Sequence, residues 1–273
     1  MSRKTWDKAL FYAFAAFFVA TIGFPFFWQV LNSFKLEKDI FSLTWFPDAY
    51  TLANYRKAFQ SRPLMEYMGN SIAVSVFATL ASMALGSMAA YALARTRIRG
   101  TGLILIVVLS VSLLPPVVIV NPIYALIRGM GLLNTRTGLV IVNTLFTLTL
   151  TIWFLVPYMH SIPAELEEAA EIDGAGPWIC YSRIIMPLVA PGVFTVGILA
   201  FIQVWNEYLF ALVMNPVRVK LVTVGLKMYE SDNYIPWGTI MAASTVIVVP
   251  LIAMVLALQK RIISGLTSGG LKE

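Results

Sequence analysis

Five carboxylate side chains lie within nine residues of this chain: Glu165, Glu167, Glu168, Glu171 and Asp173. The whole sequence of 273 residues has only 14 acidic residues, so this density needs a chemical reason. Clustered carboxylates can bind cations, transfer protons in catalysis, or face a cationic protein surface.

Metal binding and catalysis are the less favoured uses of this cluster. The only histidine, His160, has no second histidine or cysteine nearby, and no nucleophile with its base is recognisable. An amphipathic helix that simply lies on the membrane surface is another alternative. Such helices are usually basic, because anionic lipids attract them. The cluster therefore favours a short helix presented to a soluble protein with a cationic cleft.

The residues around the cluster predict where this helix begins and ends. Ser161 is a plausible N-cap, Pro163 suits the first turn, and Gly174 is a plausible C′ residue. Glutamate, leucine and alanine between them favour helix. A second short helix is expected after the bend, with Pro177 near its start and Pro187 at its end.

The elements that must position this cluster are mainly membrane spans. The sequence is 59% hydrophobic and 12% charged, with a mean hydropathy of +0.78, whereas a soluble domain has about 25% charge. A spanning helix needs about 20 mostly apolar residues. Six runs qualify, at about 10–32, 69–94, 103–127, 138–158, 188–213 and 238–259. The first is too long for a signal peptide, so we expect an uncleaved span.

Prolines and charges give the spans further character. Kinks are expected in three of the runs, at Pro25, at the pair Pro115 and Pro116, and at Pro250. Such kinks either reflect helix packing or loosen helices that line a pathway and move. Basic residues divide evenly between the two sides, but the groups at 3–8, 95–99 and 260–261 favour cytosolic termini. These small groups flank apolar runs, which argues against nucleic-acid binding despite the net charge of +6.

The acidic segment resembles the EAA signature of ABC-importer permeases. That signature is Glu-Ala-Ala, three residues, Gly, nine residues, Ile, one residue and Leu-Pro. Met186 replaces the usual leucine, a mild departure. The resemblance implies that the loop 160–187 is the coupling helix that docks on the ATP-hydrolysing subunit. The coupling residues it implies are Glu168, Ala169, Ala170, Asp173, Gly174, Ile184 and Pro187.

Other stretches resemble the carbohydrate-uptake branch of that family, of the maltose type. They include "PPVVIVNPIYALIRGMGLLNTRTGLV", "WNEYLFAL" and the glycine-rich tail "ISGLTSGGLKE" within residues 260–273. The resemblance implies one MetI-like domain over residues 1–273, an all-α polytopic membrane protein with the ABC type I importer fold. In the family the tail reaches between two ATPase subunits. A di- or oligosaccharide is the expected cargo.

The resemblance also implies partners and a place in the cell. We expect a second homologous permease, two ATPase subunits and an extracytoplasmic sugar-binding protein, in the inner membrane with both termini cytoplasmic. The sequence has no Gly-x-x-x-x-Gly-Lys-Ser/Thr loop, so ATP and Mg²⁺ should be bound by the ATPase subunits and no cofactor by this chain.

Polar residues within the spans are candidates for the substrate pathway. Glu207 is the only Asp, Glu, Lys or Arg well inside any run, and a charge there costs roughly 2.5–3.5 kcal/mol, so it should face protein or a wet cavity. Sugars favour aromatic faces and amide hydrogen bonds. The candidates are therefore Gln203, Trp205, Asn206, Glu207 and Asn121. Neighbours on a helix face different directions, so at most some line one cavity; the alternative is hydrogen bonding between helices.

A secondary active transporter of a small polar solute is the alternative function. Proton-driven carriers usually have intramembrane acid, histidine or lysine relays, and one glutamate makes a thin relay. The absence of a detected internal repeat weakens this alternative further.

Overall fold

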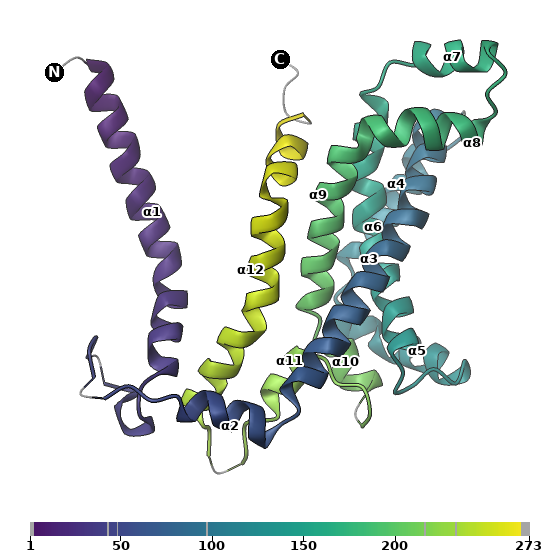
Figure 1. The fold of residues 1–273 in the computed structure, drawn as a ribbon. Coiled ribbons are helices and arrows are strands. Elements are labelled where there is room, and N and C mark those ends of the chain that lie inside the picture. The colour runs from purple at the N-terminus through teal and green to yellow at the C-terminus, as the bar shows by residue number, and fades with distance from the viewer. Residues whose placement is uncertain are drawn as a thin grey trace. The chain divides into compact units, whose positions relative to one another are not determined.

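The chain folds as a series of helices joined by turns, as Figure 1 shows. This computed structural model describes residues 3–42, 44–47, 49–96, 98–215, 217–232 and 234–268. The helices are α1 (Arg3–Ser33), η1 (Glu37–Asp39), α2 (Ala53–Ser61), α3 (Leu64–Arg95), α4 (Thr101–Leu113), α5 (Pro116–Gly129), α6 (Arg136–His160), α7 (Glu165–Ile172), α8 (Pro177–Ile179), η2 (Cys180–Ile185), α9 (Met186–Trp205), α10 (Leu209–Met214), α11 (Val222–Lys227) and α12 (Trp237–Ser268).

Among the residues that the structure describes, five helical stretches are long and apolar enough to cross a membrane by themselves. They are Leu10–Ser33, Leu64–Arg95, Arg136–His160, Pro177–Trp205 and Trp237–Gln259. In hydrocarbon every backbone N–H and C=O needs an internal partner, and a continuous helix supplies it. The described residues therefore have the all-α polytopic character that the sequence predicts.

The expected run 103–127 is not one continuous helix. It divides into α4 and α5, whose axes differ by 98°. Leu114, between them, has an extended backbone (ψ 128°) because a residue before proline avoids the helical region, and Pro115 is extended as well (ψ 127°). Two successive prolines thus produce a sharp break, which exceeds the kink that the sequence predicts.

The chain divides into two compact units. One comprises Met1–Met65 and Gly225–Val249, and the other comprises Glu66–Val224 and Pro250–Glu273. In the first unit α2 is tied to its neighbours by polar contacts. The Asn54 amide donates to the carbonyls of Ser33 and Lys35, at 2.9 and 2.8 Å.

The second unit is built around helix α6, which packs on α9 and α4. Its apolar core has two clusters. One lies where α3, α6 and α9 meet near the α7 end of the unit, around Leu155, Met159 and Ile185. The other joins α5, α6 and α10 at the opposite end, around Ile127, Val142 and Phe210.

Small residues let the long helices of this unit approach closely. A Cβ on Gly86 of α3 would lie 2.6 Å from Thr151 Cγ2 of α6, so only glycine fits there. One turn earlier the hydroxyls of Ser82 and Thr151 are 2.8 Å apart. Small residues and hydroxyl hydrogen bonds are the usual means of holding helices together in lipid, where no hydrophobic driving force acts between them.

Candidate functional site

Helix α7 contains the acidic cluster and is closed at its C-terminus as predicted. Gly174 has φ +86°, the left-handed conformation that glycine adopts most easily. The N–H of Ala175 donates to the carbonyl of Ala170 at 2.9 Å, and the N–H of Gly174 to that of Glu171 at 3.0 Å. This pair of bonds is a Schellman motif, and it confirms Gly174 as the C′ residue.

The predicted start of α7 is wrong. Helix α6 continues to His160, so Ser161 becomes its C-cap and donates its hydroxyl to the Tyr158 carbonyl at 2.7 Å. Ala164 occupies the N-cap of α7 without a side-chain hydrogen bond. Three glutamates in the first turn are instead favoured by the positive end of the helix dipole.

The predicted end of the second helix at Pro187 is also wrong. Helix α8 continues through the π-helical segment η2 into α9. Inside a regular helix the proline ring would clash with the carbonyl four residues earlier, here that of Arg183. The wider π turn immediately precedes Pro187, and the Met186 N–H there bonds to the carbonyl of Tyr181, five residues back. The change of register accommodates the proline within a continuous helix.

The outer face of the loop is exposed and mixes acidic with apolar side chains. Glu168, Ala169, Asp173, Gly174 and Pro187 are exposed, whereas Ala170 and Ile184 are half-buried. Two large apolar residues lie among them, with Ile172 87% exposed and Trp178 63% exposed. Sequence reasoning missed these two, although an isoleucine at the end of an acidic helix was the available signal. Exposed apolar groups rimmed by charge are typical of protein contact sites.

The inner face of α7 is held by α3 through an ion pair. Arg95 Nε lies 3.1 Å from Glu167 Oε2, and the two side chains are only 11% and 12% exposed. Arg95 Nη2 also donates to the Ile162 carbonyl at 2.7 Å. One carboxylate of the cluster therefore holds α7 against α3 and is not available at the outer face.

Helix α3 also holds the second half of the loop. Ser87 Oγ and Tyr181 Oη are 2.8 Å apart, and both residues are buried. The rings of Tyr91 and Tyr181 are 5.4 Å apart, and those of Trp178 and Tyr181 are 5.3 Å apart. Ser87, Tyr91 and Arg95 are spaced by four, so they form one stripe along α3. Sequence reasoning missed this stripe, which we call the α3 stripe.

The candidate pathway residues near the end of α9 occupy different environments. Trp205 is 3% exposed and stacks on Phe201 at 5.8 Å. Asn206 is exposed, and its amide donates to the Ile202 carbonyl at 2.8 Å. Asn121 is exposed on α5. Gln203 is exposed and lines a pocket between α4, α6 and α9.

Glu207 lies in the break between α9 and α10 and caps α10. Its two carboxylate oxygens accept the N–H groups of Phe210 at 2.6 Å and Ala211 at 2.9 Å. A free helix N-terminus in an apolar region has unsatisfied donors, and a carboxylate both accepts from them and complements the dipole. The charge therefore has local partners within the run 188–213.

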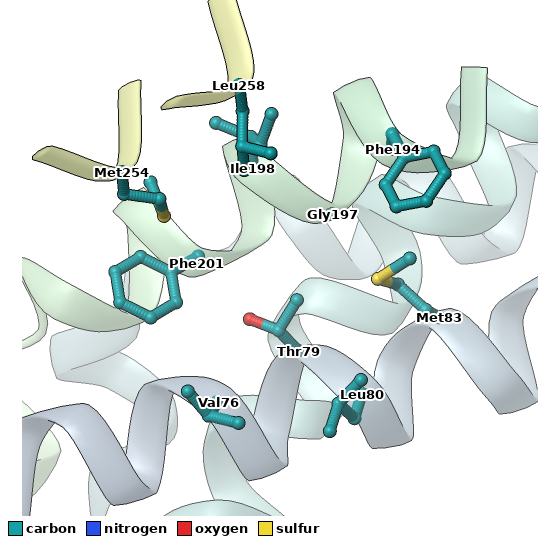
Figure 2. Close-up of a pocket in the computed structure, with 10 residues that line it drawn as sticks. All are labelled: Val76, Thr79, Leu80, Met83, Phe194, Gly197, Ile198, Phe201, Met254 and Leu258. Carbon is teal, nitrogen blue, oxygen red and sulfur yellow. The ribbon is translucent and has the colours of Figure 1, made fainter. Parts of the chain in front are cut away.

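A second pocket of this unit is a groove among α3, α9 and α12, drawn in Figure 2. Thr79 is the only labelled side chain there with an oxygen atom, and the others are apolar, among them Met83, Phe194 and Met254. Its lining offers contacts to hydrocarbon and almost no hydrogen bonds. No cluster of three His, Cys, Asp or Glu side chains able to hold a metal occurs among the described residues.

Comparisons with known proteins agree on one family. Residues 82–268 match the family model described as binding-protein-dependent transport system inner membrane component. The sulfoquinovosyl glycerol transport system permease protein SmoH of Agrobacterium fabrum is 39% identical over 91% of this chain and 88% of its own length. The trehalose/maltose transport system permease protein MalG of Thermococcus litoralis is 37% identical over 91% of both chains.

The fold has a counterpart among solved structures. It resembles one chain of a bacterial ABC transporter involved in the import of the acidic polysaccharide alginate, with a TM-score of 0.76. The likeness covers 95% of this chain and 98% of that one, at 22% sequence identity. At this identity the likeness concerns the fold alone.

Proposed function

Because the chain belongs to the family of binding-protein-dependent transport system inner membrane components, we propose that it forms a sugar translocation pathway together with a second, homologous permease. The chain is a multi-pass permease subunit of an ABC import complex. The finer assignments below concern its coupling residues, its partners and its cargo.

The coupling loop, residues 160–187, is proposed to dock in a cleft of an ATPase subunit in the cytosol. The observation that carries this proposal is the contrast between the two faces of α7. Glu168 and Asp173 are exposed on the outer face beside Ile172, whereas Glu167 is held against α3. Exposed carboxylates can pair with a cationic cleft, and Ile172 can fill an apolar pocket at its centre.

The remaining coupling residues have supporting roles in this proposal. Ala169 and Ala170 are small, so they allow the cleft to approach the helix closely. Gly174 permits the turn that closes α7. Ile184 and Pro187 belong to the helix that follows this turn and runs without interruption from α8 through η2 into α9. ATP and Mg²⁺ would be bound by two ATPase subunits.

The α3 stripe suggests how motion at the loop would reach the membrane. When two ATPase subunits close on ATP, α7 would move with them. The Arg95–Glu167 pair and the Tyr181–Ser87 contact would pass that movement to α3. A change of access follows only if ATP binding favours one state over the other. Both termini would be cytoplasmic, on the side of the coupling loop.

The cargo is proposed to be a di- or oligosaccharide delivered by an extracytoplasmic binding protein. The names of the relatives support this class: sulfoquinovosyl glycerol for SmoH, and trehalose or maltose for MalG. Asn121, Trp205, Asn206 and Glu207 are kept as pathway candidates, although Glu207 already caps α10.

Reconstitution of the assembled complex in proteoliposomes tests the function. We expect the complex, with its binding protein outside, to accumulate radiolabelled trehalose or maltose only when ATP is enclosed. Uptake should persist when a protonophore collapses the proton gradient. Uptake that needs the gradient and ignores ATP would favour the secondary transporter instead.

A further inference from the structure

The pocket between α4, α6 and α9 has a lining unlike that of the apolar groove in Figure 2. Its volume is about 250 Å³. Its lining includes Leu109, Ser112, Phe146, Thr149, Trp153 and Gln203. Aromatic rings, hydroxyls and an amide therefore face one small space within apolar helices.

Helix α6 supplies one wall of this pocket from a single face. Phe146, Thr149 and Trp153 follow the spacing i, i+3, i+7, so they lie along one stripe. Phe146 is fixed by its ring contact with Phe210 at 4.9 Å, while Trp153 is 44% exposed. The wall thus combines a ring in contact with α10 and a partly exposed indole.

Two polar groups of the pocket have no internal partner. Within the described part of the chain, neither the Gln203 amide nor the Thr149 hydroxyl makes a hydrogen bond. Ser112 differs, since its hydroxyl donates to the Leu109 carbonyl at 2.7 Å and only its acceptor lone pairs stay available. Transfer of an amide from water to an apolar environment without a hydrogen-bond partner costs roughly 2–7 kcal/mol of free energy. These groups therefore need a polar ligand or a polar neighbour.

We propose that this pocket binds one pyranose ring of the transported sugar. The Trp153 indole would cover the apolar face of the ring, and the Gln203 amide and Thr149 hydroxyl would bond to its hydroxyl groups. The volume suits a single ring, because sites that enclose a drug-sized ligand are larger, about 300–1,000 Å³. The assignment rests on the proposed sugar transport and names a contact site for it.

The position of the pocket also fits a site that opens and closes. Ser112 precedes Leu114, where the chain breaks between α4 and α5 at 98°. A change in that angle would move Ser112 relative to the α6 wall. Such a movement would change the fit of the ring.

The test uses the whole complex with its binding protein in proteoliposomes. The probes are radiolabelled trehalose, maltose, diacetylchitobiose and sulfoquinovosyl glycerol, and the one that the unaltered complex imports fastest is used thereafter. Three variants each remove one contact: Gln203→Leu, Thr149→Val and Trp153→Leu. Thr144→Val is the matched control, because the Thr144 hydroxyl bonds to the Val140 carbonyl of its own helix, outside the pocket.

We expect each of the three variants to lower sugar imported per ATP hydrolysed by about three- to tenfold, the loss typical of one neutral hydrogen bond or ring contact. In these three variants, co-purification of all subunits and ATP hydrolysis stimulated by the binding protein should stay unchanged. The control Thr144→Val should import as much sugar per ATP hydrolysed as the unaltered complex. A purely structural role would lower assembly and leave the ratio of sugar to ATP constant.

Three results would overturn the pocket assignment. One is an unaltered ratio of sugar imported to ATP hydrolysed in all three variants. Another is loss of the second permease when the Gln203→Leu complex is purified, which would make Gln203 an interface residue. The third is equal loss in Thr144→Val. If the unaltered complex imports none of the four sugars, the proposed cargo class itself fails, and the pocket assignment fails with it.

Discussion

Arg95, the last residue of α3, forms an ion pair with Glu167 of α7, with Nε 3.1 Å from Oε2. Both side chains are nearly buried, and the Arg95 guanidinium also donates a hydrogen bond to the Ile162 carbonyl. A buried pair is costly to break, because the remaining charge is left uncompensated. This contact therefore links the coupling loop to α3, in addition to α6 and α9, which continue the loop along the chain.

Breaking this pair should uncouple ATP hydrolysis from transport. We expect Glu167→Gln or Arg95→Gln to destabilise the contact by about 3 kcal/mol and to lower sugar uptake per ATP hydrolysed. The measurement is uptake and ATP hydrolysis in the reconstituted complex. Glu165→Gln is the control, because Glu165 is an exposed carboxylate of the same helix. Equal effects of Glu165→Gln and Glu167→Gln would remove the ion pair from the argument.

Gly174→Ala should weaken the coupling loop through its backbone. Alanine in the left-handed conformation costs roughly 1–2 kcal/mol, and the Schellman bonds that close α7 depend on that conformation. Gly176→Ala is the matched control: Gly176 has φ −79°, and a Cβ there meets no atom within 4 Å. We expect only Gly174→Ala to reduce co-purification of the ATPase subunits. Equal co-purification from the two variants would contradict the role of the turn.

In this loop, the sequence predicts the features that depend only on neighbouring residues. It does not predict those that depend on a competing helix or on a change of helical register. The closure at Gly174 is local and was predicted correctly, because one glycine and one helix end decide it. The start at Ser161 was wrong because α6 competes for the same residue. Pro187 was misread because the π register in front of it makes room for the ring.

Features that join distant segments were beyond single-sequence reasoning. Six apolar runs indicate membrane helices, but only the structure gives the 98° break after α4. The α3 stripe has a visible spacing in the sequence, yet nothing in the sequence pairs Arg95 with Glu167 rather than with a neighbouring carboxylate. Gln203 was nominated for its chemistry, whereas its neighbours Trp153 and Ser112 come from helices α6 and α4.

Ile172→Ser should weaken docking of the ATPase subunits without harming the permease itself. The side chain is 87% exposed, so its replacement leaves no cavity within this chain. If Ile172 fills a pocket on the ATPase, its loss should cost about 2 kcal/mol of binding. Co-purification of the ATPase with tagged permease measures this effect. Phe46→Ser is the control, since Phe46 is 84% exposed but belongs to the segment before α2 and not to the coupling loop. Undiminished co-purification with Ile172→Ser would remove this residue from the docking surface.

Glu207 offers a prediction that separates a structural role from a pathway role. Its carboxylate accepts two backbone N–H groups at the start of α10, and hydrogen bonds to a charged group contribute about 1.5–3 kcal/mol. Glu207→Gln keeps one acceptor oxygen, whereas Glu207→Leu leaves both donors unsatisfied in an apolar region. We therefore expect the thermal stability of the purified complex to fall slightly for Gln and markedly for Leu. Transport by the surviving folded complex should then remain near normal in Glu207→Gln. A Gln variant of unchanged stability that has lost sugar uptake would show that the charge acts on the cargo, and capping would not be the reason for this residue.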